Sequence, residues 1–240
     1  MTDTIDITPS PRILRMLGNI DFSAFQCLCE LIDNSIDGFN FEEAHVKEPE
    51  IYVQIPSMNS PNSDKEIIVS DNGTGMDFDQ LTRSLKAGFS GNNPIYKMGL
   101  FGMGFNISTA RLGQKTEIIT CREDDLFSYK VTIDFRELET SSKFNAPIVK
   151  VPKAADELNK HGTEIRISNL NWEHIKPLKQ KVKIAKELGK TYGRIIRDKS
   201  IGLVYEGHTC RPFSHCVWNK LRTGRDGTPA IIDIDKVIDT

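Results

Sequence analysis

The 240-residue chain contains no apolar run close to the roughly 18 residues of a membrane-spanning helix, so we expect no membrane partner. Residues 1–6 are acidic and lack the apolar core of a signal peptide. The five cysteines are scattered and odd in number, which favours reduced thiols in a cytoplasmic protein, or in a nuclear one if the source is eukaryotic. A net charge of −2 gives no global attraction to nucleic acid.

Lysine and arginine are also absent between Arg15 and Lys47, and this gap holds the first informative segment. Apolar residues recur there with a helical period, which predicts a helix that starts after Asp21 or Ser23 and ends at Gly38. Four polar residues share the opposite face of that helix, namely Glu30, Asp33, Asn34 and Asp37.

The acidic face of this predicted helix is either a solvated surface or a cation site. Like charges at these spacings repel by about a few tenths of a kcal/mol per pair. A divalent cation would remove that repulsion, and a small set of oxygen ligands suits Mg²⁺. Asn34 favours the cation site, because asparagine is a poor mid-helix residue unless its amide has a role.

The second segment is a predicted strand at residues 66–70 that runs directly into the turn Asp71-Asn72-Gly73-Thr74-Gly75-Met76. A carboxylate at the end of a strand can accept the exocyclic N–H of adenine, and it would repel the carbonyl oxygen of guanine. Gly73 and Gly75 leave room for a base or a ribose, and Met76 offers an adaptable apolar surface. The alternative is an ordinary Asn-Gly turn.

The third segment, Gly99-Leu100-Phe101-Gly102-Met103-Gly104, precedes a predicted helix over residues 104–113. The start of a helix offers N–H groups and a positive dipole to phosphate, and Lys97 adds a cation just ahead. Residues 87–102 have little periodicity, which is typical of a lid. The alternative is a flexible loop with a glycine-capped helix. A weaker fourth signal is Gly162-Thr163, which could place a hydroxyl near the base.

Taken in this order, the four segments resemble those of the GHKL ATPase superfamily, which includes gyrase B subunits, ninety-kilodalton heat-shock chaperones, histidine kinases and MutL proteins. The resemblance covers residues 8–210 and is strongest to the microrchidia branch and its prokaryotic relatives. Tyr192-Gly193-Arg194 and Tyr205-Glu206-Gly207 also fit that branch. A histidine kinase is not expected, because no histidine precedes His45 to act as a phosphoacceptor upstream of the first segment.

The resemblance implies an α+β fold of the Bergerat type, a two-layer α/β sandwich with a mixed sheet, one helical layer and a long ATP lid. It implies an ATP-binding domain with an N-terminal arm at residues 1–207, and the start of a further element or second domain at 208–240. Glu30 would be the catalytic general base, Asn34 would bind Mg²⁺, and Asp71 would hold adenine. The other ATP-binding residues that it implies are Asp37, Gly73, Gly75, Met76, Lys97, Gly99, Gly102, Met103, Gly104, Phe105 and Thr163.

The resemblance implies an ATPase in which slow, Mg²⁺-dependent hydrolysis of ATP drives lid closure and homodimerisation through residues 1–20 and the lid. Asn106 departs from the pattern, because some microrchidia proteins carry a basic residue there. One alternative is a nucleotide-binding dimerisation switch with negligible turnover. Another is an ATP-gated DNA-binding module, since residues 174–199 hold nine Lys or Arg against Glu187 and Asp198, although a solvated helix face would explain that run equally well.

The rest of the pattern predicts strands at residues 51–55, 116–121, 127–133, 148–151, 163–167 and 201–205, and helices at 12–17, 77–86 and 172–197. This order suggests a helical layer on one face of a mixed sheet. His208, Cys210, His215 and Cys216 are all capable of binding zinc, but their spacing fits no common ligand pattern.

Overall fold

The computed structural model describes residues 19–39, 46–57, 59, 61, 65–85, 104–141 and 145–213. The strands are β1 (Glu50–Gln54), β2 (Ile67–Asp71), β3 (Gly113–Cys121), β4 (Phe127–Asp134), β5 (Ile148–Pro152), β6 (Gly162–Leu170), β7 (Gly202–Tyr205) and β8 (His208–Thr209). The α-helices are α2 (Ala24–Gly38), α3 (Phe78–Leu85), α4 (Gly104–Leu112), α5 (Phe135–Ser141), α6 (Trp172–Ile175), α7 (Lys181–Thr191) and α8 (Gly193–Asp198). Two 3₁₀ turns are η2 (Ala155–Glu157) and η3 (Lys176–Lys179).

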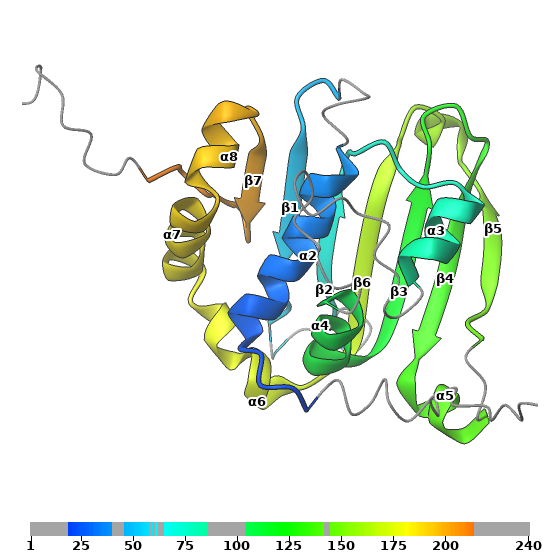
Figure 1. Cartoon of the computed structure of the whole chain (residues 1–240), viewed down its shortest axis with the longest axis horizontal. Coiled ribbons are helices and arrows are strands. Elements are labelled where there is room, and N and C mark those ends of the chain that lie inside the picture. The colour runs from blue at the N-terminus through cyan, green and yellow to red at the C-terminus, as the bar shows by residue number, and fades with distance from the viewer. Residues whose placement is uncertain are drawn as a thin grey trace, which may run out of the picture.

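The strands form one eight-stranded sheet in the order β5-β4-β3-β6-β2-β1-β7-β8 (Figure 1). β1 runs parallel to β7, and the other neighbouring strands pair antiparallel. Helices α2, α3 and α4 lie over one face of this sheet, while α7 and α8 flank β7 (Figure 1). The sheet is therefore mixed and carries a helical layer, which confirms the predicted α+β fold.

Helix α2 is central to the helical layer. Ser23 caps it through a capping box, in which the Ser23 hydroxyl accepts the N–H of Gln26 and the Gln26 side chain accepts the N–H of Ser23. Its buried apolar stripe consists of Ala24, Cys27, Leu28, Leu31, Ile32 and Ile36. Each large side chain of such a stripe contributes roughly 1.5–3 kcal/mol through burial. The predicted start near Ser23 and end at Gly38 are confirmed.

Two apolar clusters fill the space between the layers. The larger one joins α2 to β1, β2, β6, β7, α6 and α7, and the smaller one joins α3, α4 and α5 to β3 and β4. Phe22 and Phe105 pack against both clusters. The start of α4, where Phe105 lies, is therefore held between the two parts of the core and beside α2.

The opposite face of the described sheet carries paired charges. On β3, Glu117 alternates with buried residues, so it points away from the helices. Its carboxylate oxygens lie 3.1 Å from Lys115 Nζ and 2.8 Å from Lys130 Nζ. On β6, the Arg166 guanidinium lies 2.6 Å from the Glu164 carboxylate. This face is called the open face below, and Glu117 and Glu164 on it have cationic partners on the same strand or on the neighbouring one.

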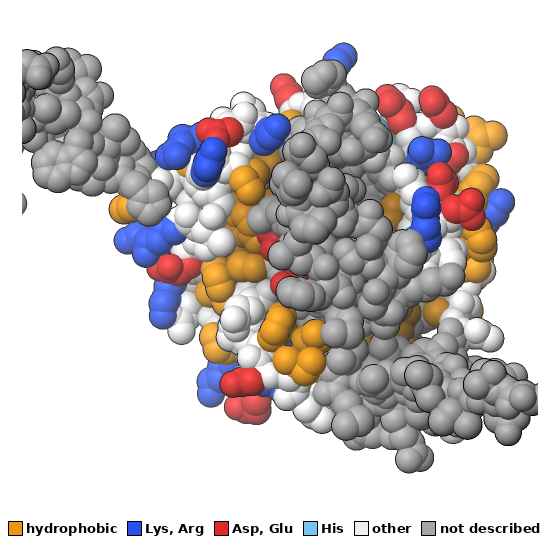
Figure 2. Space-filling model, in the orientation of Figure 1, with side chains coloured by type: hydrophobic (Ala, Val, Ile, Leu, Met, Phe, Trp, Pro, Cys, Tyr) orange, Lys and Arg blue, Asp and Glu red, His pale blue; other side chains and the backbone are white. Residues whose placement is uncertain are grey.

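The predicted long helix over 172–197 is wrong, because the structure divides that segment into α6, η3, α7 and α8. Pro177 lies in η3, where its ring and missing N–H interrupt an α-helix, and Gln180 leaves the helical region with ψ of 68°. The basic side chains of this segment therefore lie on separate short elements. Figure 2 shows Lys and Arg side chains gathered over α7 and α8, at the left.

Some expectations fall outside the described residues, including the helix at 12–17 and most of the element predicted at 208–240. Strand β8 pairs with β7 across the predicted boundary at residue 207. The sequence did not predict α5, whose first N–H groups are capped by Asp134 Oδ1, 2.9 Å from Arg136 N. Among the helices that the structure describes, none is long and apolar enough to cross a bilayer.

Candidate active site

The polar face of α2 is divided between two environments. Asn34 is exposed, and Glu30, Asp33 and Asp37 are partly buried. Asp33 Oδ1 accepts a hydrogen bond of 2.7 Å from the hydroxyl of Tyr192, which lies 2% exposed at the junction of α7 and α8. Burial raises the pKa of Asp33 to about 6, and this hydrogen bond offsets only part of the rise. Asp33 thus anchors α2 to the α7–α8 junction, a contact that the sequence did not reveal.

Glu30 meets the start of α4. Gly104 is the first residue of that helix, and a Cβ added to it would lie 2.0 Å from Glu30 Oε2. A side chain at position 104 would therefore push the Glu30 carboxylate away from the helix N-terminus. Burial raises the pKa of Glu30 above its ordinary value. The structure thus brings together the predicted general base and the end of the predicted phosphate-binding stretch.

Asp71 ends β2 and lies on the side of the sheet that faces the helices. Its Oδ1 accepts the N–H groups of Gly73 at 2.9 Å and Thr163 at 3.1 Å, and the carboxylate also accepts a hydrogen bond from the Ser35 hydroxyl of α2. Burial raises the pKa of Asp71 to about 6, and these hydrogen bonds offset part of the rise. A carboxylate has about four acceptor positions, so Asp71 can also accept an N–H from a ligand.

The turn after Asp71 closes against the end of α2 and the end of β3. The N–H and the hydroxyl of Thr74 both donate to the carbonyl oxygen of Gly38, each at 3.1 Å. Gly75 has a φ of 68°, and a Cβ there would lie 1.9 Å from the carbonyl oxygen of Cys121. Close packing against β3 is therefore a sufficient reason for Gly75, independent of the space that a ligand would need.

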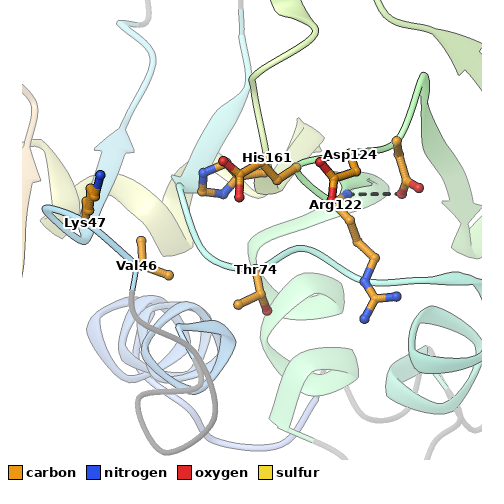
Figure 3. A pocket seen from close by; sticks show the side chains of 8 residues that line it. Val46, Lys47, Thr74, Arg122, Asp124 and His161 are labelled. Atoms are coloured by element: carbon orange, nitrogen blue, oxygen red, sulfur yellow. Dashed lines mark hydrogen bonds between the residues drawn. The ribbon is translucent and has the colours of Figure 1, made fainter.

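A cavity of about 600 Å³ lies beside this turn (Figure 3). Thr74 and His161 line it together with residues 46–47 and the β3–β4 hairpin at residues 122–125. His161 Nδ1 lies 2.7 Å from the carbonyl oxygen of Gly73, so the ring also supports the turn. Lys47, Arg122 and the acidic run at 123–125 all line the cavity, and this mixture of charges indicates no particular ligand.

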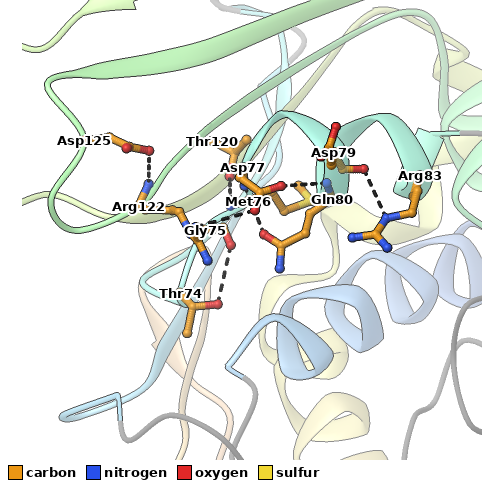
Figure 4. A network of polar contacts seen from close by, with 10 residues as sticks. All are labelled: Thr74, Gly75, Met76, Asp77, Asp79, Gln80, Arg83, Thr120, Arg122 and Asp125. Atoms are coloured by element: carbon orange, nitrogen blue, oxygen red, sulfur yellow. Dashed lines mark hydrogen bonds and ion pairs between the residues drawn. The ribbon is translucent and has the colours of Figure 1, made fainter.

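The beginning of α3 fixes the far side of the turn (Figure 4). Asp77 Oδ1 accepts the N–H of Gln80 at 2.8 Å, and Gln80 Oε1 accepts the N–H of Asp77 at 3.0 Å. The guanidinium of Arg122 lies 3.5 Å from Asp77 Oδ2. The predicted cap at Asp77 is confirmed, and it ties α3 to the β3–β4 hairpin.

Thr120 of β3 is a buried member of the site that the sequence did not single out. It is 1% exposed, and its Oγ1 lies 3.0 Å from Met76 N, from Gly162 O and from Thr163 Oγ1. A threonine in a strand is explained by β-propensity alone, so its sequence context gives no functional signal. Its contacts link the turn after β2 to the start of β6.

The predicted phosphate-binding stretch is described only at its end. Gly104 and Phe105 open α4, whereas Lys97, Gly99, Gly102 and Met103 lie outside the described residues. Asn106 in the first turn of α4 is 3% exposed, and its Nδ2 has no hydrogen-bond partner among the residues that the structure describes. This turn therefore contains a buried side-chain donor in addition to its backbone N–H groups.

A family model described as "Histidine kinase-, DNA gyrase B-, and HSP90-like ATPase" matches residues 22–163, more than half of the chain. The chain belongs to this family. The matched range contains Glu30, Asp71, Gly104 and Thr163. The predicted membership of the GHKL superfamily is therefore confirmed.

The resemblance of this GHKL chain to microrchidia proteins is confirmed by two proteins of Arabidopsis thaliana. Protein MICRORCHIDIA 3 is 34% identical over 97 residues, and Protein MICRORCHIDIA 2 is 33% identical over 103 residues. These matches cover 40% and 43% of this chain, but only 15% and 16% of the two relatives. The chain thus corresponds to a small part of each.

The GHKL domain positions its predicted site residues in two groups along α2. Asp71, Gly73 and Thr163 meet near Ser35, and Glu30 meets Gly104 five residues earlier on the helix, a rise of about 7.5 Å. The exposed Asn34 lies between these groups in the sequence of α2.

Within the described part of this GHKL domain, no group of three or more His, Cys, Asp or Glu side chains gathers at a metal-binding distance. A magnesium ion needs only one or two protein oxygens when phosphate and water complete its shell. Of the zinc-capable set, Cys210 is 1% exposed and burial raises its pKa to about 12, which is typical of an inert buried thiol. His215 and Cys216 lie outside the described residues.

Proposed function

We propose that this domain binds ATP with Mg²⁺ between α2, Asp71 and the start of α4, and hydrolyses it slowly to drive lid closure and homodimerisation. The observation that carries the proposal is the contact between Glu30 and Gly104. It sets a carboxylate that can take up a proton beside a helix N-terminus that suits phosphate. The family match makes ATP the expected nucleotide.

The donor set on α2 fits a magnesium ion. Asn34 offers an exposed amide oxygen next to the acids of the same helix, and residues 16–46 contain no Lys or Arg. Mg²⁺ prefers such oxygen ligands together with phosphate oxygens and water. Asn34 is the residue that would hold the ion, which would supply charge neutralisation of the phosphates.

Glu30 is the proposed general base. Its carboxylate would orient a water molecule and accept a proton from it as the water oxygen bonds to the γ-phosphorus of ATP. The bond from that phosphorus to the β,γ-bridging oxygen breaks, and the products are ADP and inorganic phosphate. The raised pKa of Glu30 suits this role, because a base is most effective when its pKa approaches the working pH.

Asp71 is the proposed adenine acceptor, and the first turn of α4 is the proposed phosphate-binding element. The ionised carboxylate of Asp71 would accept a hydrogen bond from the adenine amino group. The N–H groups of Gly104 and Phe105 would donate hydrogen bonds to phosphate oxygens. The ribose and the remaining phosphates would follow α2 between these two ends.

Two variants separate binding from hydrolysis. Glu30→Ala should keep Mg-ATP binding in calorimetry but lower turnover by about 10²- to 10⁴-fold, the usual contribution of a general base. Asp71→Ala should lose both binding and turnover. Glu173→Ala, an exposed acid on α6, is the matched control and should change neither. ATP binding by Asp71→Ala with the affinity of the wild type would refute the proposed site.

The same experiment distinguishes the alternative of a nucleotide-binding switch. A switch needs no general base, so equal turnover in the wild type and in Glu30→Ala would favour it. Light scattering tests homodimerisation, because a non-hydrolysable ATP analogue should double the mass of the wild type but leave Asp71→Ala a monomer. An unchanged wild-type mass would remove dimerisation from the proposal.

The basic surface over α7 and α8 favours a second candidate function, ATP-gated binding of DNA (Figure 2). Exposed cations on and before these helices are Lys176, Lys181, Lys183, Lys186, Lys190, Arg194, Arg197 and Lys199. Lys181, Lys190 and Arg194 form ion pairs with neighbouring acids. Lys183 and Lys186, which are exposed on α7, make this surface a candidate for phosphate contacts.

Salt dependence tests this second function, because binding to the DNA backbone releases counterions. If the surface makes about three phosphate contacts, affinity for duplex DNA should fall about 40-fold between about 50 and 200 mM salt. The pair of changes Lys183→Glu and Lys186→Glu would remove two of these contacts and should reduce that fall to about 4-fold or less, whereas Lys115→Glu on the open face should not change it. Weak binding that salt does not alter would dismiss DNA as a partner.

A further inference from the structure

Behind the proposed base-binding groups lies a hydroxyl with fixed partners. Thr120 is 1% exposed, whereas Asp71 and Thr163 are partly exposed. The strand register pairs Asp71 with Thr163 and Thr163 with Thr120, so the three side chains form a row across β2, β6 and β3. Thr120 is too deeply buried to touch a nucleotide, but it contacts Thr163, which is accessible.

The directions of the hydrogen bonds around Thr120 follow from a proton count. The N–H of Met76 can only donate, so the oxygen of Thr120 accepts from it at 3.0 Å (Figure 4). The carbonyl of Gly162 can only accept, so it takes the single hydroxyl proton of Thr120. The third neighbour is the Thr163 hydroxyl, also at 3.0 Å, which must then donate its own proton to Thr120.

This arrangement makes Thr163 an acceptor toward any ligand. Its hydroxyl proton is directed to Thr120, and its backbone N–H is bound to Asp71 Oδ1 at 3.1 Å. The ionised carboxylate of Asp71 is also an acceptor only. Two adjacent acceptors are complementary to a base with an amino group at this edge, as in adenine, and they repel a carbonyl oxygen at the same position.

We propose that Thr120 is a positioning residue that sets the base specificity of this domain by holding Thr163 as an acceptor. The inference rests on the proposed ATP-binding function and identifies what would make that site selective. If Thr120 served packing alone, its hydroxyl would only fill volume, and valine would replace it without changing which base is preferred.

The test is the ratio of dissociation constants for Mg-ITP and Mg-ATP, measured by calorimetry on the whole chain. ITP carries a carbonyl in place of the adenine amino group, and we expect the wild type to prefer ATP. Thr120→Val removes the acceptor of the Thr163 hydroxyl proton, so this hydroxyl can rotate and donate to the carbonyl of ITP. The ratio of the two dissociation constants should then fall about tenfold, which corresponds to the free energy of one hydrogen bond. Thr120→Ser restores the hydroxyl and should keep the ratio within about twofold of the wild type.

A second variant keeps the test decisive if Thr120→Val does not fold. Thr163→Val should lower the same ratio to a similar extent, and the double variant should add nothing, because both changes act through one oxygen. An unchanged ratio in Thr120→Val or in Thr163→Val, or a serine variant that behaves like the valine variant, would overturn this inference while leaving ATP binding intact. A wild type that binds neither nucleotide would overturn the proposed function and this inference together.

Discussion

Carboxylates on the two faces of this sheet have pKa values shifted in opposite directions. On the open face, burial alone would raise the pKa of Glu117, but hydrogen bonds and charges from Lys130 and Lys115 lower it. On the helix-facing side, burial raises the pKa of Asp71 to about 6, and its neutral hydrogen-bond donors and the charge of His161 offset only part of the rise. Burial likewise raises the pKa of Asp33 to about 6.

The difference shows which carboxylates of the fold have cationic partners within the protein. On the open face, Glu117 and Glu164 form ion pairs with nearby lysine or arginine side chains. The helix-facing side concentrates acids with raised pKa values around α2, and such clusters are characteristic of functional sites.

The largest effect on ATP turnover should come from a cation added to α2. Asn34→Lys would place an ammonium among Glu30, Asp33 and Asp37 and compete with magnesium, so ATP turnover should fall on the order of 100-fold. The melting temperature of the nucleotide-free protein should rise slightly, because like-charge repulsion of about a few tenths of a kcal/mol per pair is removed. Asn34→Ala is the control and should lose turnover without gaining stability. A lysine variant with normal turnover would contradict the magnesium role of Asn34.

The pH dependence of stability should separate the two faces. Asp33 and Asp71 have pKa values raised from 3.8 to about 6, so the folded state binds their protons more tightly than the unfolded state does. Their contribution is full below about pH 4 and is lost as the pH rises through about 6. The free energy of unfolding in urea should therefore increase on the order of 1–3 kcal/mol from about pH 7 to about pH 5.

Three substitutions identify the carboxylates that cause the rise in the free energy of unfolding between about pH 7 and about pH 5. Asp33→Asn and Asp71→Asn should each flatten the rise, whereas Glu117→Gln should leave it unchanged. Glu117 has the opposite sign, because its lowered pKa contributes stability that is present above its ordinary value of 4.5 and is lost as the pH falls further. A stability that is flat from about pH 7 to about pH 5 in the wild type would show that Asp33 and Asp71 ionise normally.

A pair of tyrosines tests the contrast between the two sides of the sheet, because each side has one tyrosine that donates a hydrogen bond of 2.7 Å to a carboxylate. Tyr192 donates to Asp33 in the core, and Tyr52 donates to Glu50 on the open face, where Tyr52 is 41% exposed. Tyr192→Phe should cost about 1–2 kcal/mol in urea unfolding. It should also raise the pKa of Asp33 further, since this hydrogen bond lowers it. Tyr52→Phe should cost less than about 0.5 kcal/mol, and equal costs would refute the contrast.

The smallest effect should come from the open face itself. Glu117→Gln removes the carboxylate shared by Lys115 and Lys130, and partly exposed pairs of this kind contribute about 0.2–1 kcal/mol. Nucleotide affinity and turnover should stay at the values of the wild type. A change in turnover would mean that the two faces are coupled through β3.

Local patterns allowed much of the fold to be predicted. The Ser23 cap, the apolar period and Gly38 lie within one helix, so they predicted α2, and Asp77 predicted the start of α3. Composition predicts one helix over residues 172–197, because Pro177 lies in the early part of the segment. The structure shows that Pro177 and Gln180 interrupt the helix there.

Contacts between distant residues could not be predicted. Tyr192 lies 159 positions from Asp33, and Thr120 lies 43 positions from Thr163, so no periodicity or spacing connects them. Glu30, Asp71 and Gly104 were found because each belongs to a local motif. Thr120 belongs to none, and its role depends on the register of three strands.

The contact between Glu30 and Gly104 also makes the two positions interdependent. An alanine at 104 would push the Glu30 carboxylate away from the helix N-terminus, while Glu30→Asp would withdraw the carboxylate by one methylene and make room for that alanine. A library randomised at both positions and selected for folding alone should therefore accept alanine at 104, because the end of a flexible side chain can move aside. Selection for turnover as well should restore the pair of glutamate at 30 and glycine at 104.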